Sequence, residues 1–160
     1  MESIQTKIRL KKKKKMMNII NHVFSMDETT INFSGDKNDT YFKAIKNSFT
    51  SAISGKSNLS DEVKKMKGLS GRKFRVMMNH LIKNLEDPKY LEIGSWLGSS
   101  ACSVCFNNKV NITCIDDWSQ NFSTNLDSKK IFKSNLKKFL NEDISRQIIE
   151  KDFREVNFKN

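Results

Sequence analysis

The pattern of apolar and polar positions predicts a strand, a turn, a short helix and a second strand between residues 89 and 118. Residues 90–93 (YLEI) form a short apolar run that leads into a turn rich in glycine and serine. A second apolar run, residues 110–115, ends in the acidic pair Asp116 and Asp117. The whole stretch has about 30 residues, the usual size of a βαβ unit. It therefore predicts two parallel strands joined by a helix.

Apolar residues at helical spacing predict three amphipathic helices around this unit. The first has Asp39 as its candidate N-cap, and its apolar positions are Tyr41, Phe42, Ile45, Phe49 and Ile53. The second has Ser70 as its candidate N-cap, and one face carries Phe74, Met77, Met78, Leu81, Ile82 and Leu85. The third covers residues 129–140, with Ile131, Leu136, Phe139 and Leu140 facing inward. We expect each stripe to pack in the core.

A third apolar run lies at residues 147–149, and Asp152 follows it closely. Strands that alternate with helices indicate an α/β chain with a parallel sheet and helices on its faces. Ligands of such sheets bind at the carboxyl ends of the strands. The residues that follow the three strands are therefore the candidate site.

Length and composition favour one globular domain with no membrane span. The chain has 160 residues, of which 37% are hydrophobic and eleven are phenylalanine. No run approaches 18 apolar residues, and the basic start lacks the apolar segment of a signal peptide, so a cytoplasmic location is the default. The three cysteines favour reduced thiols. Cys102 and Cys105 lie one helical turn apart, but only His22 and His80 supplement them, so we expect core residues and no metal.

The net charge of +11 is concentrated at the start of the chain. Residues 1–15 contain seven Lys or Arg and one acid, a net +6 that leaves +5 for the rest. Lys11 to Lys15 would repel one another on a helix, so residues 1–15 are interpreted as a disordered arm that binds polyanions non-specifically, or as an untranslated leader before Met16. Residues 16–65 are interpreted as a variable helical region, and residues 66–160 as the domain that carries the site.

The glycine turn separates the candidate ligands. Gly94 and Gly98 are separated by three residues, so the G-x-G-x-x-G dinucleotide pattern is absent, and no Gly-Lys-Ser/Thr follows. Glycine lacks Cβ, which lets the backbone adopt a positive φ and approach a ligand closely. The remaining pattern, Glu92-x-Gly94-x-x-x-Gly98-x-Ser100 with an acidic pair after the next strand, resembles motif I of the class I S-adenosylmethionine-dependent methyltransferases. YLEIGSWLGSS is most similar to the catechol and macrocin O-methyltransferase branch, and the resemblance covers about residues 66–160.

This resemblance implies a Rossmann-like sheet in the strand order 3-2-1, with S-adenosylmethionine as the cofactor. It implies that Asp116, or Asp117 as second choice, accepts hydrogen bonds from the ribose hydroxyls. Glu92 would lie at the ammonium end, Ser100 would receive the carboxylate at the helix start, and Asp152 would lie near the adenine edge. The other candidate cofactor-binding residues belong to the turn and the helix start: Gly94, Ser95, Trp96, Gly98 and Ser99.

Each candidate also has a structural alternative. Glu92 alone is compatible with a solvated edge residue, and Ser99 or Ser100 with a helix N-cap. The acids after the strands are compatible with ordinary strand ends. Trp96 is compatible with a pocket wall or with core packing. The loop of residues 68–71 resembles a segment that approaches the methionine end of the cofactor in related enzymes.

The resemblance also defines what the chain is expected to do. The family's sheet has the order 3-2-1-4-5-7-6, and this sequence supplies strands 1 to 3, so we expect a cofactor-binding half, truncated or part of a split enzyme, with no catalytic residue assigned. The expected reaction is methyl transfer to oxygen of a small or sugar-like acceptor. The alternatives are a non-catalytic module tethered by its basic arm and a nucleic-acid methyltransferase. An unpaired edge of the first strand would favour self-association or a second chain as partner.

Overall fold

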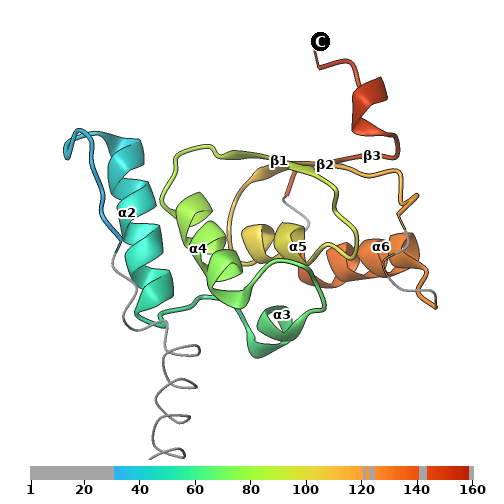
Figure 1. The fold of residues 1–160 in the computed structure, drawn as a ribbon, viewed down its shortest axis with the longest axis horizontal. Helices are drawn as coiled ribbons and strands as arrows, with labels where there is room; N and C mark the ends of the chain where they lie inside the picture. The colour runs from blue at the N-terminus through green and yellow to red at the C-terminus, as the bar shows by residue number, and fades with distance from the viewer. Residues whose placement is uncertain (1–30, 121, 123–124, 141–143, 159–160) are drawn as a thin grey trace, which may run out of the picture. The chain divides into compact units, whose positions relative to one another are not determined.

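The computed structural model describes residues 31–120, 122, 125–140 and 144–158. The basic arm of residues 1–15 lies outside the described residues. Residues 1–34 and 35–160 form two units, and every element named below belongs to the second unit. In chain order, these elements are α2 (Thr40–Ile53), α3 (Asp61–Lys65), α4 (Arg72–Lys83), β1 (Lys89–Ile93), α5 (Ser99–Cys105), β2 (Asn111–Ile115), α6 (Ser128–Phe139), β3 (Arg146–Ile149) and η2 (Phe153–Glu155) (Figure 1).

The three strands form a parallel sheet with β2 in the centre. The predicted α/β class and the strand adjacency 3-2-1 are therefore confirmed. Glu92 pairs with Cys114, and Cys114 with Ile148. The hydrogen bonding continues past the strands, because the amide of Gly94 donates to the Ile115 carbonyl at 2.9 Å and the amide of Asp116 to the Ile149 carbonyl at 3.1 Å. The turn after β1 therefore begins in register with the end of β2.

The helices α4, α5 and α6 lie on the same face of the sheet (Figure 1). Side chains alternate along a strand, so Ile112 and Cys114 point to this face while Leu91 and Ile93 point away from it. Leu91 and Ile93 are each 50% exposed. The prediction that helices flank the sheet is therefore confirmed, and within the described residues α4, α5 and α6 lie on one of its faces.

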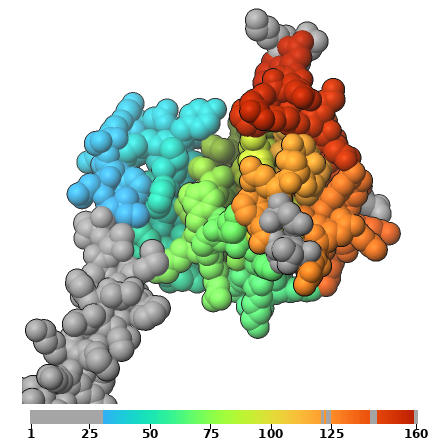
Figure 2. All heavy atoms as spheres, turned by 45° about the vertical axis from the view of Figure 1, so that its right-hand side comes forward, coloured from blue at the N-terminus to red at the C-terminus, as the bar shows by residue number. Residues whose placement is uncertain are grey.

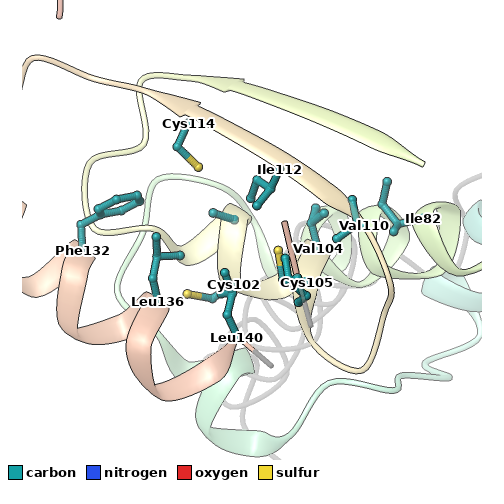
Figure 3. Close-up of a cluster of buried hydrophobic side chains, with 12 residues drawn as sticks. Ile82, Cys102, Val104, Cys105, Val110, Ile112, Cys114, Phe132, Leu136 and Leu140 are labelled. Carbon is teal, nitrogen blue, oxygen red and sulfur yellow. The ribbon is translucent and has the colours of Figure 1, made fainter. Parts of the chain in front are cut away.

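The core lies between that face and the three helices (Figure 3). All three cysteines, Cys102, Cys105 and Cys114, are buried there as free thiols. Burial raises the pKa of the thiols of Cys105 and Cys114 to about 12, so both stay protonated at neutral pH. The interpretation of Cys102 and Cys105 as small core residues is confirmed.

Helix α2 begins where the sequence predicted, but its buried face differs. The amide of Phe42 donates to Asp39 Oδ1 at 2.7 Å, which confirms the N-cap. The buried residues of α2 are the small Ala44, Ser48 and Ala52. Tyr41 and Ile45 are 67% and 42% exposed, so their prediction as core residues is wrong. The reason is that α2 packs against α4 through its small residues, which occur every four positions.

The predicted N-cap of α4 is also corrected. Gly71, not Ser70, is the N-cap, and it makes no side-chain capping bond. The Ser70 hydroxyl instead lies 3.0 Å from the hydroxyl of Ser100, at the start of α5. Phe74 is 49% exposed, so its place in the predicted core stripe is wrong, whereas Met77 and Ile82 are buried as expected.

Helix α4 also buries two polar residues, Arg75 and Asn79, which the predicted apolar stripe did not include. Arg75 donates to the carbonyls of Val63, Lys64 and Met66, at the carboxyl end of α3. Asn79 Nδ2 donates to the carbonyls of Ser103 and Phe106, both at 2.8 Å, at the end of α5. Carbonyls at the carboxyl end of a helix have no hydrogen-bond partner within that helix. Arg75 and Asn79 supply the missing donors, and in doing so they join α4 to α3 and α5.

The third predicted helix, α6, begins after Asp127, whose side chain accepts from the amide of Lys130. Leu136 and Leu140 are buried as predicted, but Ile131 and Phe139 are only partly buried. The main core residue of α6 is Phe132, which is fully buried and was absent from the predicted stripe. No helix in the described ranges is long and apolar enough to cross a membrane.

Candidate functional site

A cleft of about 540 Å³ lies at the carboxyl ends of the three parallel strands. Its lining residues come from the loop before α4 and from the segments that follow β1, β2 and β3: Leu69, Ile93, Gly94, Trp96, Ile115, Asp116, Asp117, Trp118, Ser119, Gln120, Phe122, Lys151, Asp152, Phe153 and Arg154. This is where the sequence analysis placed the site. Five of the ten predicted site residues line the cleft: Gly94, Trp96, Asp116, Asp117 and Asp152.

The two glycines of the turn have different structural roles. Both adopt a positive φ, +82° at Gly94 and +80° at Gly98. A Cβ on Gly98 would lie 2.9 Å from Cδ2 of Phe132, so the missing side chain allows α6 to pack closely. A Cβ on Gly94 would meet no protein atom within 4 Å, and Gly94 lines the cleft. Only Gly94 therefore leaves space beside the cleft.

Asp116 joins the turn after β1 to the segment after β2. Its Oδ2 accepts from the amide of Trp96 at 2.7 Å, and its Oδ1 accepts from the amide of Trp118 at 2.7 Å. The indole Nε1 of Trp118 donates back to the Trp96 carbonyl at 2.9 Å. An ionised carboxylate has about four acceptor positions, so the two oxygens of Asp116 retain capacity for hydroxyl groups of a ligand. The backbone thus holds this carboxylate in place at the cleft.

Asp117 lines the cleft beside Asp116, with its side chain exposed. Its Oδ1 accepts from the amide of Ser119 at 3.0 Å and from the hydroxyl of Ser119 at 2.8 Å. Hydrogen bonds to the charged form, first of all the one from the Ser119 amide, lower the pKa of Asp117 below its usual value. Asp117 is therefore an anion at neutral pH.

Glu92 lies on the helix-covered face of the sheet, just before the turn, and is only 8% exposed. The hydroxyl of Tyr90 donates to its Oε2 at 3.0 Å. Burial raises the pKa of Glu92 to about 7, because a desolvated carboxylate is disfavoured. The side chain does not line the cleft, so any effect on a ligand passes through the turn.

Unpaired polar atoms are concentrated at this turn. Six buried side-chain nitrogen or oxygen atoms make no hydrogen bond of ordinary geometry to the described residues, and three of them are Glu92 Oε1, Ser95 Oγ and Trp96 Nε1. The Ser95 hydroxyl nevertheless lies near enough to Glu92 to act against the rise in the pKa of that carboxyl. Buried polar groups in folded proteins almost always have a partner. At the turn after β1, the indole N–H of Trp96 is therefore a buried donor for which the described residues offer no acceptor.

Ser99 and Ser100 lie under the loop of residues 68–71, away from the cleft lining. A Cβ on Gly68 would lie only 1.9 Å from Ser99 Oγ, so the loop backbone approaches the start of α5 closely. Ser100 shares a hydrogen bond with Ser70. The role that the resemblance implies for Ser100 stays a prediction, while Leu69 of the same loop lines the cleft.

After β3, Asp152 and Arg154 form an ion pair that lines the cleft. Arg154 Nε lies 2.9 Å from Oδ1 and 3.0 Å from Oδ2 of Asp152, and Nη2 also bonds Oδ2. Hydrogen bonds from Arg154 lower the pKa of Asp152 to about 2. The carboxylate of Asp152 is therefore held at the cleft by Arg154, while its place near an adenine edge stays a prediction.

Aromatic residues form the walls of the cleft. Trp96 is 8% exposed and meets Phe122 edge to face at 5.5 Å between ring centroids, while Lys67 Nζ lies 5.8 Å from the Trp96 ring. Both interpretations of Trp96 hold, because it is a wall of the cleft and is buried as well. Sequence reasoning missed Trp118, Phe122 and Phe153, whose only indication was that aromatic residues follow the second and third strands.

The described residues contain no cluster of three or more His, Cys, Asp or Glu side chains that could hold a metal ion. Comparisons of the chain with models of protein families, with curated proteins and with solved structures found no match.

Proposed function

We propose that the cleft at the ends of β1, β2 and β3 binds S-adenosylmethionine and that the chain takes part in methyl transfer. The observation that carries this proposal is the position of Asp116. Its carboxylate stands at the end of the central strand, 2.7 Å from the amide of Trp96 in the glycine turn, and it lines the cleft. An acid fixed beside an open glycine turn suits a ribose diol rather than a phosphate group.

The chemistry of the lining residues fits an adenosyl sulfonium compound. Asp116 and Asp117 offer acceptors for two neighbouring hydroxyl groups and favour a cationic ligand. The ring of Trp96, over which Lys67 Nζ lies at 5.8 Å, adds aromatic surface to the cleft. Apolar side chains of Ile93 and Phe153, which are 50% and 47% exposed, offer surface for a flat base. The resemblance in residues 90–100 supports the same ligand.

The bound cofactor would supply an activated methyl group, which passes to a nucleophile in an SN2 step. The contribution of this chain is positioning, because such a step depends on holding the two reacting groups in line. By resemblance, the acceptor is an oxygen of a small or sugar-like molecule, and a base removes its proton where needed. We assign no catalytic residue.

Isothermal titration calorimetry of the full chain tests the proposal. We expect S-adenosylmethionine and S-adenosylhomocysteine to bind at least about tenfold more tightly than NAD, because the turn lacks the dinucleotide pattern. Asp116→Asn should weaken both sulfur compounds, whereas Glu86→Gln, an exposed acid before β1, is the matched control and should not. Binding of NAD without a response to either sulfur compound would reject the proposal.

A further inference from the structure

The exposed side of α6 carries a dense set of lysines. Five of its twelve residues are lysine, and the helix contains no acid. Two lysines form ion pairs, since Lys129 pairs with Glu150 after β3 and Lys138 pairs with Glu62 of α3, and Lys133 also lies near enough to Glu150 to help lower the pKa of that carboxyl. The other three, Lys130, Lys133 and Lys137, are exposed and recur at i, i+3 and i+7, so they share one side of the helix. We call these three residues the α6 lysine stripe.

The apolar side of α6 is fully used by the core. Phe132 and Leu136 are 0% and 3% exposed, and they pack against the sheet and α5 (Figure 3). A helix that binds a membrane surface must insert an apolar face into the lipid boundary. The outer side of α6, which Figure 2 shows in orange beside the green of α3, offers lysine instead, so a lipid surface is the less suitable partner.

The spacing of the stripe matches a regular array of negative charge. From Lys130 to Lys137 the helix rises by about 10 Å. Along one strand of a nucleic acid duplex, a phosphate recurs about every 3.4 Å of axis, so about three phosphates face this length. Exposed lysines without a shaped pocket suit such a repeating partner, because each cation needs only to displace a counterion.

The first turn of α6, where the stripe begins, is joined to a segment that lines the cleft. The ion pair of Lys129 with Glu150 joins the first turn of α6 to the end of β3, and the next residue, Lys151, lines the cleft. We propose that the α6 lysine stripe binds the phosphate backbone of nucleic acid, as a surface of the folded domain that is separate from the arm of residues 1–15. This inference does not depend on the proposed cofactor, and it gives the +5 charge outside the arm a location and a role.

Fluorescence anisotropy of the full chain with a labelled 20-nucleotide RNA, at several salt concentrations, tests the proposal. The variant Lys130→Gln/Lys133→Gln/Lys137→Gln should bind at least about tenfold more weakly at 100 mM salt, and the slope of log K against log salt should fall by about 2, near 0.7 for each lost contact. The variant with arginine at the same three positions should bind like the wild type. A duplex DNA probe shows whether the stripe distinguishes the two nucleic acids.

Two controls make the result specific. The matched variant Lys43→Gln/Lys46→Gln/Lys56→Gln removes the same charge from exposed positions in and after α2, and it should retain affinity within about twofold. A variant with Lys11 to Lys15 changed to Gln measures how much of the RNA affinity comes from the arm. The proposal would be overturned if the arm variant bound no RNA while the stripe variant kept the affinity of the wild type. Equal losses in the stripe and α2 variants, no RNA binding by the wild type, or binding to anionic vesicles alone would also overturn it.

Discussion

The backbone amide of Trp96 donates to Asp116 Oδ2 across 2.7 Å, so a single carboxylate fixes the turn after β1 to the end of β2. The other oxygen of Asp116 accepts from the amide of Trp118 at 2.7 Å. The same side chain therefore organises the protein and stands at the cleft. A test of its role has to separate these two effects.

Replacing Asp116 should destabilise the fold and also weaken the binding of the ligand. Asp116→Ala leaves the amides of Trp96 and Trp118 without an acceptor, which should lower the free energy of unfolding by about 1 to 3 kcal/mol. Asp116→Asn keeps one acceptor oxygen, so its free energy of unfolding should fall by less than that of Asp116→Ala. Urea unfolding measures both, and Asp117→Asn serves as the control because its carboxylate bonds only the exposed Ser119 in the turn that follows. Equal stability of the Ala variant and the wild type would contradict this account of the turn.

The two glycines should respond differently to substitution. Gly98→Ala places a Cβ 2.9 Å from Phe132 at a φ of +80°, and should lower the free energy of unfolding by about 1 to 3 kcal/mol. In Gly94→Ala the new Cβ meets no neighbour within 4 Å, so the free energy of unfolding should fall by only about 1 kcal/mol, because of the φ of +82°. The same Cβ should obstruct the ligand. Unfolding curves and calorimetry on both variants measure the two effects. If Gly94→Ala binds S-adenosylhomocysteine normally, the ligand does not lie on the turn.

The buried carboxyl of Glu92 should make stability depend on pH. Burial raises its pKa from 4.5 to about 7, so the folded protein binds a proton that the unfolded chain has released. This stabilisation is complete below pH 4.5 and declines as the pH rises toward 7, by on the order of 3 kcal/mol at most. Glu92→Gln has no such proton, so the difference in unfolding free energy between the two proteins should change across this range. A constant difference from pH 4.5 to 7 would show that Glu92 is not buried as described.

The unpaired edge of β1 should promote self-association. Within the described residues β1 pairs only with β2, and Leu91 on the uncovered face is 50% exposed. Exposed apolar edges recruit other strands. Sedimentation velocity should show association that increases with concentration, and Leu91→Lys should reduce it. A wild-type chain that remains a single monomeric species at all concentrations would contradict this expectation.

The local pattern of the sequence was sufficient to predict the strands, the turn and the acids that follow them. Short apolar runs and glycine turns are properties of neighbouring residues, so Gly94, Asp116 and Asp152 could be placed at one end of the sheet before the structure. The Asp39 cap was predictable for the same reason, because a cap bonds an amide only three residues away.

Features that depend on contacts distant in sequence were not predictable. Arg75 and Asn79 are buried because their partners are carbonyls of other helices, and hydrophobicity alone places such residues outside the core. The need for glycine at position 98 comes from Phe132, 34 positions later in the sequence.

A two-dimensional ¹H–¹⁵N NMR titration of the full chain with S-adenosylhomocysteine tests the central claim most directly. The account predicts that the largest shifts occur in the amides of Gly94, Trp96 and Trp118. The amides of Trp96 and Trp118 bond the Asp116 carboxylate, and all three residues line the cleft. Resonances at the opposite end of the strands, such as those of Lys109 and Asn111, should stay unchanged. Saturable shifts centred on Lys109 and Asn111, or a spectrum unaffected by millimolar ligand, would contradict the proposal that the cleft binds this cofactor.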